Sequence, residues 1–134
     1  VYLSGTWSSA RAGALSKRYG RGVVVLAAAL LMLLGALAVA ASSLWVALAG
    51  LLVFTASFFA LHSTASGWVG LIAERDRAEA SSMYVFCYYM GSSILGAATG
   101  WAYEGLPWAG FVAVLAVMLG VLAVVSAALW KGAR

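Results

Sequence analysis

The sequence contains no Asp, Glu, Lys or Arg between residues 22 and 73, and this uncharged stretch directly follows a basic segment at residues 13–21. A helix of about 20 apolar residues crosses the roughly 30 Å hydrocarbon core of a membrane, so the stretch is long enough for two crossings. Over the whole chain 65% of residues are hydrophobic and 9% are charged, whereas a soluble domain carries about 25% charged residues. The sequence therefore predicts an all-α, polytopic membrane protein.

Turn signals divide the chain into four complete transmembrane helices, preceded by the end of a fifth. Ser42-Ser43 separates the first two helices, the charged segment 74–79 separates the second and third, and Gly105-Leu106-Pro107 precedes the fourth. Asp76 followed three residues later by Glu79 resembles a capping box, which marks a helix start. We expect a helix end at 1–10, a loop at 11–22, and helices at about 23–41, 44–73, 77–103 and 107–130.

The distribution of basic residues predicts the orientation of these helices, because Lys and Arg in short loops resist translocation. A cytoplasmic loop at 11–22 places the loop at 74–79 and the C-terminus in the cytoplasm as well. All eight basic residues then lie on one side: Arg11, Lys17, Arg18, Arg21, Arg75, Arg77, Lys131 and Arg134. Four aromatic residues gather at the opposite boundary, where such residues are enriched: Trp45, Trp101, Tyr103 and Trp108.

The second and third expected helices carry hydroxyl and aromatic side chains, whereas the first and fourth are almost purely aliphatic. Polar groups are costly in hydrocarbon and usually face a cavity or a partner helix. The candidates for lining a substrate path recur at three- and four-residue steps: Thr55, Phe59, His62 and Ser66 on the second helix, and Tyr84, Tyr88 and Ser92 on the third. Lining of an aqueous path and packing between helices both remain open for these faces. The small-residue series Ser92, Gly96 and Gly100 favours packing.

His62 and the loop charges each allow two interpretations. An imidazole exchanges protons near neutral pH, so His62 is able to relay a proton; we favour the alternative, a structural hydrogen bond to a carbonyl or to Ser66. Arg18 and Arg21 either pair with the acidic residues of the loop at 74–79 or remain solvated. An exposed pair of this kind contributes about 1 kcal/mol or less.

Residues 13–21, with the sequence Gly-Ala-Leu-Ser-Lys-Arg-Tyr-Gly-Arg, resemble the Gly-x-Leu-Ala-Asp-Arg-x-Gly-Arg loop signature of the major facilitator superfamily. Lys17 stands where the family has Asp. The matching positions are Gly13, Leu15, Arg18, Gly20 and Arg21. The resemblance implies that Gly13, Arg18, Gly20 and Arg21 belong to a cytoplasmic gating loop.

Two downstream stretches, 58–68 and 80–93, resemble a bacterial inner-membrane branch of predicted efflux permeases. This resemblance implies that the chain is the C-terminal part of a twelve-helix, two-half transporter, with the end of helix eight and helices nine to twelve. It also implies that helix ten lines the cavity, helix eleven faces the other half, and helices nine and twelve are peripheral.

The function implied by the resemblance is secondary active transport of a small molecule by alternating access, as proton-coupled efflux across the bacterial cytoplasmic (inner) membrane. The expected partners are the lipid bilayer, the N-terminal half of the same transporter, a small-molecule substrate and protons, but no nucleic acid. We expect no enzymatic activity, catalytic residue, cofactor or metal. The alternatives are a small four-helix multidrug exporter acting as a dimer and a non-transporting membrane scaffold.

Overall fold

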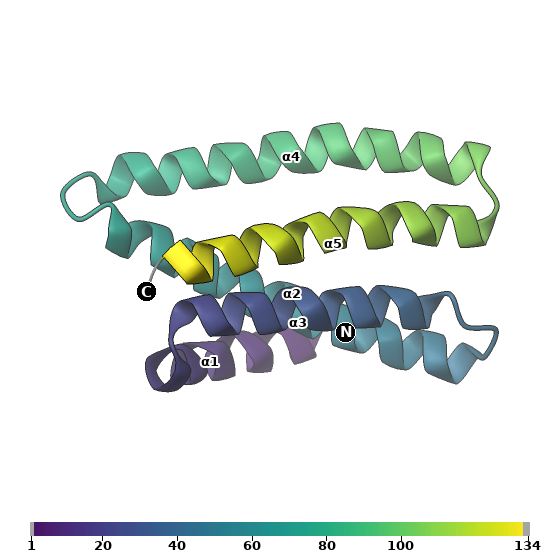
Figure 1. Cartoon of the computed structure of the whole chain (residues 1–134), viewed down its shortest axis with the longest axis horizontal. Helices are drawn as coiled ribbons and strands as arrows, with labels where there is room; N and C mark the ends of the chain where they lie inside the picture. Colours follow the sequence, from purple (N-terminus) through teal and green to yellow (C-terminus); the bar gives the residue numbers. More distant parts are fainter. Residues whose placement is uncertain (1, 133–134) are drawn as a thin grey trace.

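The computed structural model describes residues 2–132, which form five helices without any strand. The helices are α1 (Tyr2–Tyr19), α2 (Arg21–Val39), α3 (Leu44–Ile72), α4 (Arg77–Gly105) and α5 (Trp108–Gly132). Helices α2 to α5 run back and forth along the long axis, so the α2–α3 and α4–α5 connections lie at one end and the α1–α2 and α3–α4 connections lie at the other (Figure 1). The expected all-α class is confirmed for the described residues.

Three of the described helices, α2, α3 and α5, are long and apolar enough to cross a membrane. Helix α4 has the same length as α3, 29 residues, but its Ser, Tyr and Gly residues make it less apolar. The α1–α2 and α3–α4 connections lie at the same end of the helices as the C-terminal end of α5 (Figure 1), and basic residues flank all three. Arg134, one of the basic residues assigned to that side, lies outside the described residues.

Helix α2 is the centre of the packed core. It contacts α1, α3 and α5, and its small and branched side chains allow close approach on several sides. Its buried hydrophobic side chains are Val24, Val25, Ala28, Ala29, Met32 and Ala36. Gly35 of α2 meets Gly50 of α3 where the two helices cross, and Trp130 of α5 packs over Gly22.

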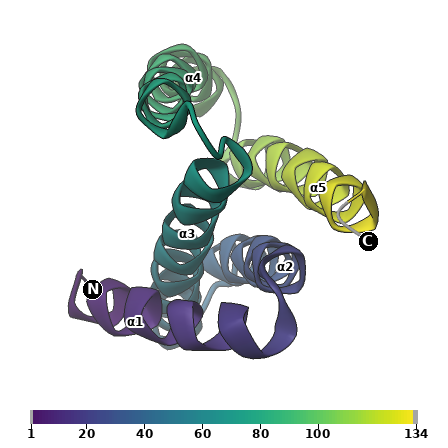
Figure 2. The same ribbon diagram turned by 90° about the vertical axis from the view of Figure 1, so that its left-hand side faces the viewer.

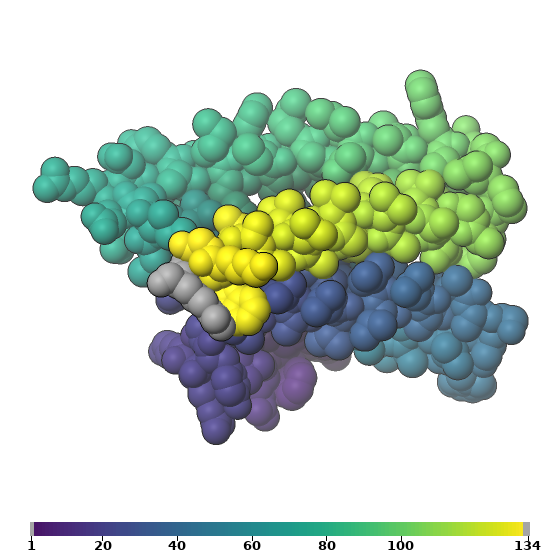
Figure 3. All heavy atoms as spheres, viewed as in Figure 1, coloured from purple at the N-terminus to yellow at the C-terminus, as the bar shows by residue number. Residues whose placement is uncertain are grey.

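Helix α4 has no buried residue, and in the described chain it contacts only α3 and α5. Figure 2 shows it on the far side of α3 and α5 from α1 and α2, and Figure 3 shows α5 lying between α4 and α2 on one face. Ser92 is exposed, and a side chain added to Gly96 or Gly100 would meet nothing within 4 Å. Within residues 2–132, this small-residue series therefore has no packing partner.

The structure differs from the expected loop at 11–22, because α1 continues through Tyr19 and α2 begins at Arg21. Arg, Lys, Leu and Ala are good helix formers, and Lys17 and Arg18 in the last turn complement the negative end of the helix dipole. Gly20 alone separates the two helices, with φ 91° and ψ 151°. That combination is essentially restricted to glycine.

The α3–α4 connection also differs from its sequence interpretation. Asp76 occupies the N-cap position of α4 but makes no side-chain capping hydrogen bond, so the expected capping box does not form. The turn is closed instead by the Asp76 backbone N–H, which donates to the Ala73 carbonyl at 2.9 Å, and by Arg77 Nε, which donates to the Glu74 carbonyl at 3.1 Å. This short connection holds α3 and α4 as an antiparallel pair.

Candidate functional site

His62 lies where α3 faces α4, in contact with three aromatic side chains. Tyr84 Oη lies 2.9 Å from His62 Nδ1 and 3.4 Å from the His62 carbonyl oxygen. The ring centroid of Tyr88 is 4.7 Å from that of the imidazole. Phe58 stacks on the imidazole with the two planes 11° apart and the centroids at 5.9 Å. We call Phe58, His62, Tyr84 and Tyr88 the histidine cluster.

Helical periodicity on two antiparallel helices positions this cluster. Phe58 and His62 are four residues apart on α3, and Tyr84 and Tyr88 are four apart on α4, a spacing that places both members of each pair on one face. His62 lies about 15 Å along α3 from its end, and Tyr84 about 11 Å along α4 from its start, at 1.5 Å per residue. The α3–α4 turn therefore brings the two pairs to similar heights.

The histidine cluster combines a titratable ring with a hydroxyl in a half-buried setting. His62 and Tyr84 are both intermediate in exposure, and their hydrogen bond occupies one ring nitrogen. Among residues 2–132, no protein group forms a hydrogen bond with the other nitrogen, Nε2. The hydrogen-bond partner of the His62 ring within the described chain is Tyr84 rather than the expected carbonyl or Ser66, and the favoured structural role of His62 stays a prediction.

The predicted polar face of α3 is divided between two neighbours. Phe59 faces α1: its ring centroid lies 6.5 Å from that of Tyr2, and it packs over Gly5. Thr55 Oγ1 donates to the Leu51 carbonyl at 2.9 Å within α3. His62 faces α4.

Phe59 touches the histidine cluster through Phe58, with the two ring centroids 5.6 Å apart. Tyr84 and Tyr88 join His62, as described above, whereas Ser66 and Ser92 are exposed. Neither serine makes a hydrogen bond within residues 2–132. The structure thus brings three of the seven predicted residues together.

Phe58 was not predicted from the sequence, although its position four residues before His62 was a usable signal. The polar contacts between α1 and α3 were also missed. Ser8 Oγ donates to the Ala56 carbonyl, and Ser9 Oγ donates to the Phe59 carbonyl at 3.4 Å. No spacing rule connects serines with carbonyls of a helix so distant in the chain.

The predicted gating residues surround Gly20 in the structure. Gly13 lies within α1 and Arg21 begins α2. The Arg18 guanidinium carbon lies 5.3 Å from the centre of the Tyr19 ring. Within residues 2–132, neither Arg18 nor Arg21 forms an ion pair with the acidic residues of the α3–α4 connection, so the loop-to-loop pairing is absent there.

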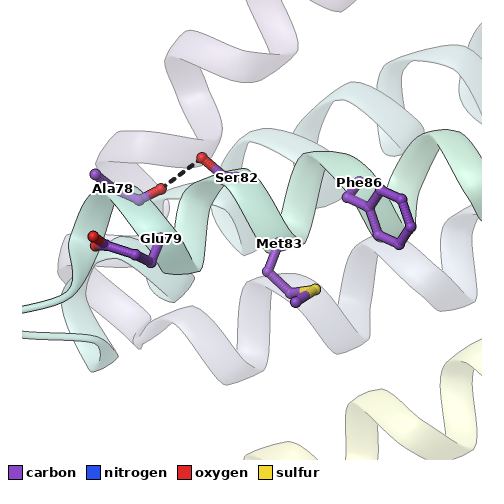
Figure 4. A pocket seen from close by; sticks show the side chains of 5 residues that line it. All are labelled: Ala78, Glu79, Ser82, Met83 and Phe86. Carbon is purple, nitrogen blue, oxygen red and sulfur yellow. Dashed lines mark hydrogen bonds between the residues drawn. The ribbon is translucent and has the colours of Figure 1, made fainter.

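Figure 4 shows the side chains that line a hollow on α4, and none of them belongs to the histidine cluster. Its lining comes entirely from one helix: Ala78, Glu79, Ser82, Met83 and Phe86. Ser82 Oγ donates to the Ala78 carbonyl at 2.8 Å, so the hydroxyl is already engaged within the helix. A surface built from one helix does not enclose a ligand, and the histidine cluster remains the better candidate site.

The chain is similar to several bacterial proteins named as transporters. It is 48% identical over 119 residues to the inner membrane transport protein YnfM of Escherichia coli, covering 89% of this chain and 28% of that protein. It is 38% identical to the uncharacterized MFS-type transporter YybF of Bacillus subtilis, over 89% of this chain and 30% of that protein. An uncharacterized transporter of Buchnera aphidicola (subspecies Schizaphis graminum) is 39% identical, over 89% of this chain and 29% of that protein.

The chain thus spans under a third of the length of these curated relatives. No family model matches the sequence, and no solved structure matches it. The identity to these relatives extends along most of this chain, and one of the relatives is named as an MFS-type transporter. The expected resemblance is confirmed: over most of its length the chain matches a part of bacterial transporters, one of which is named as a member of the major facilitator superfamily.

Proposed function

We propose that the chain supplies helices nine to twelve of a secondary transporter that moves a small molecule across the bacterial inner membrane by alternating access. Three observations support this function: the transporter names of its relatives, the inner-membrane name of one of them, and three helices suited to a bilayer. Transport of this kind uses two halves that rock about a central site. The N-terminal half is therefore the proposed partner.

Helix α4 is proposed as a fourth span, with the α1–α2 and α3–α4 connections and the C-terminus in the cytoplasm. Its 29 residues rise about 43 Å at 1.5 Å per residue, more than the roughly 30 Å of hydrocarbon that a span must cross. Its charged residues lie near its two ends, at Arg77 and Glu79 and at Glu104. This arrangement leaves only uncharged side chains at membrane depth.

The substrate path is proposed to run along the α3–α4 face. The observation that carries this proposal is the hydrogen bond between Tyr84 Oη and His62 Nδ1 at 2.9 Å, made by a helix that has no buried residue. Polar and ionisable groups at membrane depth usually face a cavity or a partner. Aromatic rings from both helices add surfaces suited to an aromatic substrate.

Water accessibility tests the path without knowledge of the substrate. In the protein carrying this chain, with Cys87→Ser, single cysteines at Ser66 and Ser92 are expected to react with a membrane-impermeant maleimide. Val121→Cys, exposed in the middle of α5, is the control and is expected to stay unlabelled. Failure of both serine positions to react, in correctly inserted protein, would contradict an aqueous path along this face.

Coupling to protons is tested by transport into inverted membrane vesicles with the aromatic dye ethidium as the probe. Proton-coupled export predicts dye accumulation that a proton ionophore abolishes. A proton relay through His62 requires that His62→Gln lower the rate and flatten its pH dependence, whereas the structural role favoured above requires an unchanged pH profile. Tyr103→Phe, at the other end of α4, is expected to leave both unchanged. An unaltered pH profile in His62→Gln would eliminate the proton-relay role of His62.

A further inference from the structure

A groove of about 690 Å³ lies between α1, α2 and α3, away from the histidine cluster. One part of its lining is apolar and built from small or branched residues, including Val24, Ala28 and Leu31 of α2 and Ala60 of α3. The other part carries two cationic side chains, Arg11 and Arg18 of α1. The groove is therefore amphipathic along its length.

The two arginines are oriented by aromatic neighbours rather than by carboxylates. The Arg11 guanidinium carbon lies 5.1 Å from the centre of the Trp7 ring, and Arg18 is placed similarly over Tyr19, as described above. Within residues 2–132 neither arginine forms an ion pair, and the first acidic residue of the chain is Glu74. Both guanidinium groups thus remain available to an anion.

The spacing of these features matches a phospholipid. Arg11 and Arg18 are seven residues apart, which is two helical turns or about 11 Å along one face of α1. The apolar wall of α2 from Val23 to Leu31 is about 12 Å long, close to the roughly 15 Å thickness of one hydrocarbon leaflet. Arginine binds phosphate oxygens through paired N–H donors, and basic pockets between helices on the cytoplasmic side bind anionic head groups.

We propose that this groove binds an anionic phospholipid, with its phosphate on Arg11 and Arg18 and one acyl chain along α2. The inference requires that α2 and α3 cross the membrane and that lipid reaches the groove, and it concerns a surface separate from the proposed substrate path. Trp7 forms part of the groove and is 63% exposed, so its fluorescence reports on the occupant.

The test uses the protein carrying this chain, reconstituted in vesicles of phosphatidylcholine that contain either brominated phosphatidylglycerol or brominated phosphatidylcholine at equal mole fraction. Bromine quenches nearby tryptophan, and subtraction of a Trp7→Phe variant isolates the Trp7 signal. We expect the anionic lipid to quench Trp7 at least twofold more than the neutral lipid. The difference is expected to disappear in Arg11→Gln/Arg18→Gln and to persist in Arg11→Lys/Arg18→Lys.

The matched control is Arg75→Gln/Lys131→Gln, which removes the same charge from residues that do not line the groove and is expected to retain the preference. Should the double Gln variant fail to insert, Arg11→Gln and Arg18→Gln alone are each expected to halve the preference. Equal quenching by both lipids, or a preference that survives the Gln substitutions, would overturn the proposal. Protection of Trp7 from both lipids would overturn it as well, because protein would then cover the groove.

Discussion

Gly35 of α2 and Gly50 of α3 approach so closely that a Cβ atom added to Gly35 would lie 2.7 Å from the carbonyl oxygen of Gly50. The same added atom would lie 2.8 Å from the Phe54 backbone nitrogen, so the obstruction is backbone that cannot rotate away. Small residues allow this approach between helices in a membrane, where no hydrophobic effect drives their association. The α2–α3 pair therefore depends on the absence of two side chains.

Gly35→Ala is expected to destabilise the protein by about 1–3 kcal/mol, the usual cost of overpacking. The measurement is the midpoint of thermal unfolding in detergent, followed by circular dichroism. Gly120→Ala is the control, because an added Cβ there meets nothing within 4 Å. Alanine has a helix propensity more favourable than that of glycine by about 1 kcal/mol, so this variant is not expected to be destabilised. A Gly35→Ala midpoint equal to that of Gly120→Ala would show that the crossing is not tightly packed.

Gly20→Ala is expected to destabilise the α1–α2 connection by about 1–3 kcal/mol, because the backbone angles at Gly20 are strained for any residue with a Cβ. Gly13→Ala, in the same signature but within α1 and in open space, is expected to be neutral or stabilising. Unfolding midpoints of the two variants provide the comparison. The opposite order would mean that Gly20 does not adopt its positive φ in the folded protein.

The hydrogen bond between His62 and Tyr84 is expected to contribute about 0.5–1.5 kcal/mol to the free energy of unfolding, as is usual for such bonds. A double-mutant cycle of His62→Phe and Tyr84→Phe measures this coupling. Tyr103→Phe combined with His62→Phe is the control and is expected to show no coupling, since Tyr103 packs instead on Phe111 of α5. Additive effects in the first cycle would contradict an interaction between the two side chains.

Reporter fusions are expected to place the α1–α2 and α3–α4 connections on the cytoplasmic side and the α2–α3 and α4–α5 connections outside. Alkaline phosphatase, which is active only outside the cytoplasm, is fused after residues 20, 43, 75 and 105 in turn. Activity is expected at 43 and 105 alone. Equal activity at 75 and 105 would show that α4 does not cross, and activity at 20 would reverse the orientation.

Much of the helical architecture was predictable, because apolar runs and turn residues act locally. Pro107 lacks an N–H and suits the start of a helix, and its carbonyl accepts from the Phe111 N–H at 3.0 Å directly before α5. The continuation of α1 through Arg11 and Lys17 was not predicted, because charged residues mark loops only on average. Arg and Lys have a high helix propensity, and in this segment they continue α1 instead of forming a loop.

The candidate site was only partly predictable, because helical spacing identifies a face but not the helix it contacts. His62 and Tyr84 were singled out separately, yet their hydrogen bond depends on the geometry of the α3–α4 turn. Phe59 shares the predicted face with His62 but packs against α1. Gly96 and Gly100 resembled a packing series although no described helix covers them. Tertiary neighbours decided each outcome.

Gly20 is the single residue that joins α1 to α2. Because one residue joins two continuous helices, very few torsion angles connect their directions, and the contacts of Gly5, Ser8 and Ser9 with α3 hold α1 in place. The 18 residues of α1 make a helix about 27 Å long. A rotation of α1 by about 10° at Gly20 would displace Tyr2 by about 5 Å, roughly twice the 2.3 Å backbone radius of a helix. Even a small change in the torsion angles at Gly20 would therefore separate Tyr2 from Phe59 of α3, and the contacts between α1 and α3 oppose such a change.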